Sequence, residues 1–383
     1  MTVFFEYDGL TWPEIAELPR NTPLLIPVGV VPDLTELAKE LGNPPRIGVL
    51  PPVPFGWPGS GLVIRPGAFG DHLENLLQSM REDGFTRVHA VVAAESGSEL
   101  DIVSKITLQN GATPATHPLP PDSERRKVIL IPIGHTEQHA LHLPLCTDTV
   151  IIDAIARGTQ AAASDLCHSL PVMPYGVSTH RSSFAGTLSA GGRAFEDFWL
   201  GVVDLLVDRG FDRFYFLSGH GGNMSFLVNV VKYAGERHRR IFCATAFLHT
   251  SGPIGAAAIE RYRTSGIGGM GHAGELETSF MLHLRPVLCH MERVKDETDF
   301  VSTPSYYMDW IEAGSLIANP PWDDDTRTGA YGAGSHATAE KGRLWLAAAI
   351  EEKVAHVREI HDQQKRREAR RNEGYGLWGK KAK

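Results

Sequence analysis

The sequence has few cysteines, no long apolar run and no excess of basic residues. Its 4 cysteines among 383 residues form neither a CxxC pair nor a dense framework, which argues against a disulfide scaffold and favours a reduced, cytoplasmic setting. No stretch of 18 or more apolar residues occurs, so no membrane span is expected, and the N-terminus lacks the pattern of a secretory signal. A net charge of -8 disfavours a nucleic-acid binder.

What is present is the composition of a globular protein, with 42% hydrophobic and 21% charged residues. From residue 126 onward, short apolar runs alternate with helical periodicity. The pattern predicts strands at 127–133, 170–173, 213–217 and 240–247, and helices at 149–163, 195–210 and 224–233. This alternation is typical of βαβ units, so we expect an α/β fold with a mainly parallel sheet covered by helices on both faces.

Three segments of the first 100 residues resemble three later segments in the same order. "PLLIPVGVV" (23–31) resembles "VILIPIGHT" (128–136), "PPVPFGW" (51–57) resembles "LPVMPYGV" (170–177), and "LLQSMREDGFTRVHAVVAAES" (76–96) resembles "LLVDRGFDRFYFLSGHGG" (205–222). An ordered set of three indicates an internal, shortened repeat. The alternative is that common βαβ patterning produced the similarity.

The repeat suggests a domain organisation. We expect a shortened copy at 1–110, a Pro-rich linker at 111–126, the main domain at 127–360 and a polar, basic tail at 361–383. The candidate ligand residues described next occur in the second copy but not in the first, where Val30, Val31 and Ala94–Ser96 stand instead. Because the scaffold does not need them, they point to chemistry.

Histidines and carboxylates gather directly after the apolar strand at 127–133. Glu137 and His139 are two residues apart, so their side chains point the same way on an extended strand end. Asp148 follows just before a helix, where it could instead serve as an N-cap. Imidazole nitrogens and carboxylate oxygens together are what borderline divalent metals prefer.

Two further clusters follow later elements. His220 lies in "LSGHGGN" after a strand, and its neighbouring glycines allow a close backbone approach. "GGMGHAGELETS" (268–279) contributes His272, Glu275 and Glu277, although acidic residues also favour a helix start. Together these ligands suffice for two adjacent metals bridged by one carboxylate, a pair that generates hydroxide and polarises a carbonyl.

The segments "GHTEQHALHLPLCTDT", "SGHGGN", "HAGELETS" and "GAYGAGSHATAEKGR" together resemble the creatininase (creatinine amidohydrolase) family over residues 126–355. The resemblance implies a three-layer α/β/α fold, with the N-terminal copy as a degenerate, metal-free half. It implies two divalent metal ions, Zn and/or Mn with Fe as an alternative, and hydrolysis of a C–N bond in a cyclic amide, formamide or small amide through a metal-bound hydroxide. A homo-oligomer is also implied.

The resemblance also carries residue roles. Four residues match metal ligands of the family: Glu137, His139, Asp148 and His220. Asp148 is the expected bridge, and His272 matches the catalytic histidine, which protonates the departing nitrogen. Gly222 stands where creatininase proper has a glutamate that binds metal. Glu277 is the natural replacement for that ligand, and whether Glu275 is the fifth ligand instead is left open.

Other positions depart from the family pattern. Ala140, Leu141 and Cys146 replace Gly, Pro and Gly, and His135 stands where a small residue is common. The candidates for lining the substrate pocket are His135, His142, Glu275 and Asn223. Two alternatives to small-amide hydrolysis stay open, namely peptidase-like trimming of a modified peptide and a non-catalytic scaffold.

Two segments outside the ligand set carry structural expectations. The glycine-rich stretch 265–271 is predicted to be a mobile flap, or else a plain turn. Residues 1–110 are predicted to pack where a neighbouring subunit would lie and to contribute no metal ligand. Within them, the turn 55–58 either forms a wall of the substrate pocket or is buried for stability alone.

Overall fold

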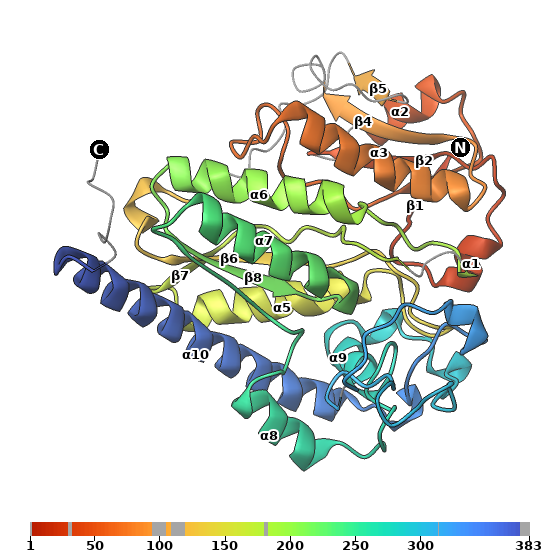
Figure 1. Ribbon diagram of the computed structural model, residues 1–383. Helices are drawn as coiled ribbons and strands as arrows, with labels where there is room; N and C mark the ends of the chain where they lie inside the picture. The colour runs from red at the N-terminus through yellow and green to blue at the C-terminus, as the bar shows by residue number, and fades with distance from the viewer. Residues whose placement is uncertain are drawn as a thin grey trace.

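A computed structural model describes residues 2–29, 33–93, 105–108, 119–179, 183–312 and 314–375. Its strands form two sheets, one with the order β1-β3-β2-β4-β5 and one with the order β7-β6-β8-β9 (Figure 1). Every strand pairing in both sheets is parallel. In the described part of the chain, no helix combines the length and apolar character needed to cross a bilayer.

The first sheet belongs to the N-terminal part of the chain. Its strands are β1 (Val3–Glu6), β2 (Leu24–Val28), β3 (Arg46–Val49), β4 (Val88–Ala93) and β5 (Lys105–Leu108). Its helices are α1 (Trp12–Ala16), α2 (Leu34–Glu40) and α3 (Pro66–Glu82).

The second sheet carries the larger part of the molecule. Its strands are β6 (Val128–Ile133), β7 (Cys167–Ser169), β8 (Arg213–Ser218) and β9 (Phe242–Ala246). The helices are α5 (Thr147–Ala162), α6 (Gly192–Asp208), α7 (Met224–Arg237), α8 (Pro253–Tyr262), α9 (Glu275–Leu284) and α10 (Ala339–Asn372). Short 3₁₀ turns lie at Asp122–Glu124, Gly221–Asn223, Pro286–Leu288, Met291–Arg293, Trp322–Asp324 and Gly334–His336.

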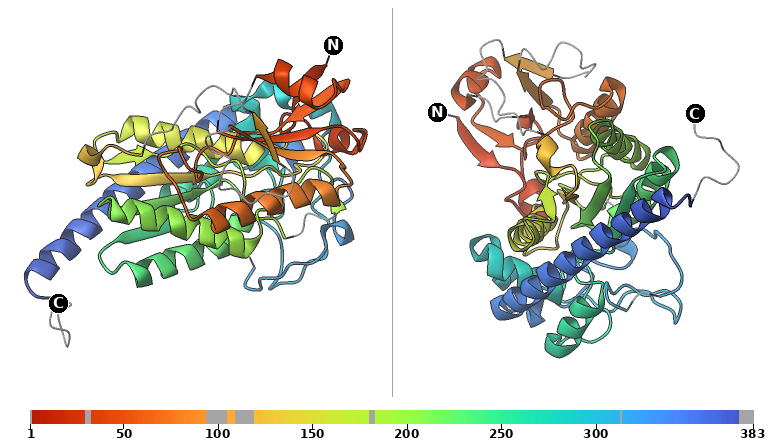
Figure 2. Two further views of the ribbon diagram at one scale, coloured as in Figure 1. Left: turned by 90° about the horizontal axis from the view of Figure 1, so that it is seen from above. Right: turned by 90° about the vertical axis from the view of Figure 1, so that its left-hand side faces the viewer.

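Strand β6 is buried on both faces, because its alternate side chains enter two different cores. Ile129 and Ile131 join a core that also contains side chains of β2, α3, α6 and α7. Val128 and Leu130 join a second core formed with α5, α9 and α10. Helices α3 and α6 lie side by side (Figure 1), and the long helix α10 crosses the second half in Figure 2. One apolar core therefore spans both halves of the chain.

The two sheets correspond strand by strand. The order β3-β2-β4-β5 matches β7-β6-β8-β9, with β1 as an added edge strand. Val28 bridges Val53 just as Ile133 bridges Met173, at the positions that the sequence comparison aligns. An internal repeat accounts for this correspondence and stays a prediction, because the contrasted residues 30–32 and 94–96 lie outside the described residues.

Most predicted element ends differ from the structure by a few residues, and two predicted segments differ more. The strand expected at 170–173 is instead Cys167–Ser169, with only an isolated bridge at Met173. The polar, basic tail expected from residue 361 is helical as far as Asn372, because α10 continues to that residue. Gln364 explains why: its side chain is buried, and its Nε2 donates to Asp212 and to the carbonyl of Arg240.

Candidate metal centre

The candidate ligands meet at the carboxyl ends of two adjacent strands. β6 and β8 pair in parallel up to Ile133 and Ser218, so the segments that follow them leave the same edge of the sheet. The first turns of α5 and α9 also reach this edge, with Asp148 and Glu277 respectively. Three groups result, each with ligand atoms within 4.8 Å of one another: His135, Glu137 and His220; Glu137, His139 and His272; and His139, Asp148 and Glu277.

Asp148 lies between two histidines. Its Oδ1 is 3.1 Å from His139 Nε2, and its Oδ2 is 3.2 Å from His220 Nδ1. It is not the N-cap of α5, a position that Cys146 occupies; it stands in the first turn, where the helix dipole favours a negative charge. Around it, Glu137 Oε2 is 2.9 Å from His220 Nδ1, and Glu277 Oε2 is 3.8 Å from His139 Nε2.

Backbone carbonyls orient both histidines. His139 Nδ1 donates to the carbonyl of Glu137 at 3.0 Å, and His220 Nε2 donates to the carbonyl of Val177 at 3.0 Å. Because a carbonyl only accepts, each ring in its neutral form directs its other nitrogen, with a lone pair, at the carboxylates. This is the arrangement by which proteins orient metal-ligating histidines. The donor set therefore fits divalent cations.

The electrostatics of the cluster also favour cations. Burial disfavours a charged imidazole, yet the Asp148 carboxylate raises the pKa of His139 to about 9, and the carboxylates of Glu137 and Asp148 raise that of His220 to about 10. Burial raises the pKa of Glu277 to about 7. Carboxylates packed this closely away from solvent need positive charge, which bound metal ions supply in exchange for protons.

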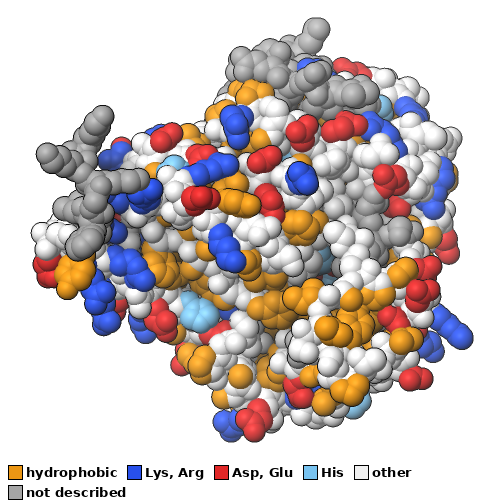
Figure 3. Space-filling view, viewed as in Figure 1, with side chains coloured by type: hydrophobic (Ala, Val, Ile, Leu, Met, Phe, Trp, Pro, Cys, Tyr) orange, Lys and Arg blue, Asp and Glu red, His pale blue; other side chains and the backbone are white. Residues whose placement is uncertain are grey.

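A cavity of about 320 Å³ opens onto the cluster, with His220, His272 and Glu277 in its lining. Its larger apolar lining residues are Phe226, Tyr306, Met308, Trp310, Ile317 and Trp322. Figure 3 shows hydrophobic side chains gathered over the loops that follow α9. Sequence reasoning did not single out these loops, although the aromatic-rich stretch 306–310 is a signal that could have found them.

Three of the four pocket candidates have other roles. His142 Nε2 lies 3.0 Å from Thr278 Oγ1, and Asn223 Oδ1 accepts from the backbone of Val177. Glu275 pairs with Lys341 at 2.5 Å, so of the two glutamates on α9 only Glu277 belongs to a ligand group. None of the four candidates, His135 included, is among the described lining residues of the cavity, so their place in the substrate pocket stays a prediction.

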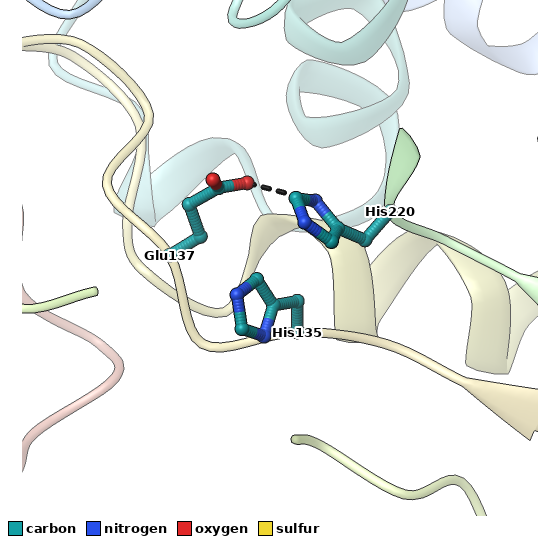
Figure 4. Close-up of side chains that lie close together, drawn as sticks. All are labelled: His135, Glu137 and His220. Atoms are coloured by element: carbon teal, nitrogen blue, oxygen red, sulfur yellow. Dashed lines mark ion pairs between the residues drawn. The ribbon is translucent and has the colours of Figure 1, made fainter. Parts of the chain in front are cut away.

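The fourth candidate, His135, faces the cluster. Figure 4 shows it beside Glu137 and His220, and its ring centroid is 4.3 Å from that of His220. By contrast, Phe55 of the turn 55–58 is buried and packs against Phe198 and Trp199 of α6 rather than lining the cavity. Within the described part of residues 1–110, no residue belongs to the three ligand groups.

The sequence model of the creatininase family, which is described as creatinine amidohydrolase, matches residues 119–357 of this chain. This chain belongs to the creatininase family. It is therefore a creatininase-family amidohydrolase, and both the resemblance seen in the sequence and the α/β fold class are confirmed.

This chain matches curated relatives over most of the length of each relative. The mycofactocin precursor peptide peptidase of Mycobacterium ulcerans (strain Agy99) is 31% identical over 242 residues, which is 60% of this chain and 84% of the relative. The creatinine amidohydrolase of Pseudomonas putida is 26% identical over 253 residues, or 61% of this chain and 89% of the relative.

Solved creatininase structures share the fold. A creatininase with Mn has a TM-score of 0.52 at 22% identity, covering 62% of this chain and 92% of that protein. A Zn–Zn creatininase variant has a TM-score of 0.51 at 23% identity, with the same coverage of both chains.

Proposed function

We propose that this creatininase-family chain is a dinuclear metal-dependent amidohydrolase that cleaves a C–N bond in a small amide. The observation that carries the proposal is the position of Asp148, whose two carboxylate oxygens each lie beside a different histidine. One metal ion is assigned to Glu137, His220 and Asp148, and the other to His139, Glu277 and Asp148.

Zinc or manganese is the proposed metal. Imidazole and carboxylate ligands suit both ions, and related structures contain a Zn–Zn pair or Mn. Such a pair polarises an amide carbonyl and lowers the pKa of water, so that hydroxide is available near neutral pH.

His272 is the proposed proton carrier. Its Nε2 donates to the carbonyl of Gln138 at 2.6 Å, which leaves the lone pair of Nδ1 directed toward Glu137, at 3.9 Å from Oε2. Nδ1 takes a proton from the attacking water and passes it to the departing nitrogen. The ring of Trp322 packs on His272 with centroids 4.8 Å apart, which shields this transfer from solvent.

The cavity supports an uncharged substrate. Apart from the side chains of the cluster, its described lining residues are apolar, aromatic or uncharged polar. An amide that carries a charged substituent would lose its hydration there without gaining a partner. We therefore propose a small, neutral amide with an apolar substituent.

A second candidate is the trimming of a modified peptide. It is favoured by the similarity to mycofactocin precursor peptide peptidases over 84% of the relative's length. A panel of cyclic amides, formamides and short peptides with apolar ends separates the two candidates. Turnover confined to peptides would replace small-amide hydrolysis with peptide trimming.

Metal analysis tests the centre itself. We expect about two metal ions per purified chain by elemental analysis, and loss of turnover after exhaustive chelation. Asp148→Asn should remove both ions, because each loses its shared ligand. Activity that survives complete chelation, or a metal content that Asp148→Asn leaves unchanged, would contradict the proposal.

A homo-oligomeric assembly and a cytoplasmic location complete the proposal. The 4 free cysteines, two of them buried, are compatible with a reducing setting. Light scattering of the purified protein and fractionation of its host cells test the two points separately.

A further inference from the structure

His135 combines full burial with a polar atom that has no partner. Its side chain is 0% exposed, and its Nε2 has no hydrogen-bond partner among the described residues. One of its ring nitrogens lies within 4.8 Å of ligand atoms of both Glu137 and His220 (Figure 4). A buried, unsatisfied polar atom is costly, so one beside a reaction centre calls for a functional explanation.

The backbone determines where the proton of His135 resides. The N–H of Gly176 donates to His135 Nδ1 at 2.9 Å, so this nitrogen offers its lone pair. A neutral imidazole that accepts at Nδ1 must carry its hydrogen on Nε2. Gly176 itself is held tightly, because a Cβ there would overlap Asn223 Oδ1, the atom that accepts from the N–H of Val177.

The other three histidines of the cluster have the opposite orientation. His139, His220 and His272 each donate one N–H to a backbone carbonyl and turn a lone pair inward. A ring that turns a lone pair inward can bind a metal or accept a proton. His135 instead has its hydrogen on the nitrogen that is not bonded to Gly176, so it is suited to neither task.

We propose that His135 is a catalytic hydrogen-bond donor, whose Nε2–H binds the amide oxygen as that oxygen becomes negative. The inference rests on the proposed amide hydrolysis. When the oxygen of water bonds to the carbonyl carbon, the π electrons of the carbonyl move to its oxygen. They return when the C–N bond breaks and the nitrogen leaves with a proton. His135 keeps its own proton throughout and stabilises the oxyanion, as preorganised donors do in other acyl-transfer sites.

Two substitutions separate the two ends of the imidazole ring. In His135→Asn the side-chain oxygen of the asparagine can still accept a hydrogen bond from the N–H of Gly176. The asparagine side chain is, however, too short to place a donor at the position of Nε2. In His135→Gln the longer side chain places an N–H₂ group near the position of Nε2. We expect His135→Asn to lower kcat by about 100- to 1000-fold with little change in KM, and His135→Gln to recover much of the loss. A kcat within about threefold of wild type in His135→Asn, or equal losses in both variants, would overturn the proposal.

Two measurements besides activity complete the test. Elemental analysis should find the same metal content in the wild type and in both variants; a loss in His135→Asn would make His135 a metal ligand and refute the donor role. Calorimetric titration of the zinc-loaded protein with acetate, a product-like carboxylate, should show about tenfold weaker binding in His135→Asn than in the wild type. Equal affinities of the wild type and His135→Asn for acetate would also contradict the role of His135 as a hydrogen-bond donor.

The acetate titration distinguishes this inference from the proposed function. If the wild-type protein binds two metals but hydrolyses no amide, the proposed function fails. The acetate affinities of the two variants then still decide whether His135 presents a donor to an oxygen anion at the metal centre.

Discussion

At the scale of single residues, two glutamates in one helical turn have different tasks. Glu277 belongs to a ligand group, whereas the Glu275 carboxylate is held by Lys341 and by the backbone N–H groups of Thr264 and Ser265. We expect Glu277→Gln to lose at least one metal ion per chain. The matched change Glu275→Gln should keep the metal content but lower the free energy of unfolding by about 2 kcal/mol, because it leaves Lys341 without its charged partner.

Elemental analysis and chemical denaturation measure both effects. The assignment would be wrong if Glu275→Gln lost metal while Glu277→Gln retained it.

His72 gives the protein a predictable sensitivity to acid. It is buried between α3 and α6 beside Phe198, with centroids 4.6 Å apart, and burial lowers its pKa from 6.5 to about 3. Between these two values the unfolded chain binds more protons than the folded one, so this contribution to stability rises with pH and is complete above 6.5. At pH 5, His72 costs about 2 kcal/mol relative to neutral pH.

Replacement of His72 by an apolar residue should remove its share of the pH dependence. Because other buried histidines also have lowered pKa values, we expect His72→Leu to make the stability profile less steep between pH 4 and about 6.5, as measured by denaturant unfolding at a series of pH values. An unchanged slope would show that His72 is not the group responsible.

At the scale of elements, the glycine-rich segment 265–271 is packed rather than loose. Gly268 donates its N–H to Asp309, a buried carboxylate that also pairs with Arg263 at 2.7 Å. A Cβ on Gly271 would overlap the carbonyl oxygen of Tyr331, whereas one on Gly266 would meet nothing within 4 Å. Close backbone approach accounts for the glycine at position 271, and the mobile flap stays a prediction.

The two glycines form a matched test. Gly271→Ala should lower the free energy of unfolding by about 2 to 3 kcal/mol, because either the helix start of α9 or the Tyr331 segment must shift. Gly266→Ala should change it little. Thermal denaturation measures both, and equal effects would restore the flap as the better explanation.

At the scale of the whole molecule, the N-terminal half supports the ligand-bearing segments. The carbonyls of Asp8 and Leu10 accept from the N–H groups of Cys146 and Leu145, each at 2.9 Å. The carbonyl of Leu145 in turn accepts from Glu137 at 3.1 Å, so two hydrogen bonds link the first half to a candidate metal ligand. The shared core adds a large apolar contact between the halves.

Removal of residues 1–110 should therefore have a severe effect on solubility and metal content. It exposes the apolar faces of α6 and β6, so we expect residues 111–383 alone to aggregate and to lose metal. Co-expression of residues 1–110 as a separate chain should restore solubility. A truncated protein that stayed soluble, with the same assembly and full activity, would disprove the supporting role.

The sequence by itself determined the α/β class, the family and the set of candidate ligands. Those features depend on local patterns: alternating apolar runs mark strands and helices, and parallel strands bring the segments after β6 and β8 to one sheet edge. It could not determine which neighbouring side chains enter the cluster. Glu275 and Glu277 are equivalent by type and differ only in what each helix face meets.

Only the tertiary structure decided contacts between distant segments. Much of the cavity wall comes from residues 306–310 and 317–322, whose irregular backbone leaves no periodic signal in the sequence. The tautomer of His135 depends on the N–H of Gly176, 41 residues away. Which nitrogen of a histidine carries the proton is a property of its hydrogen-bond partners, and folding alone brings those partners together.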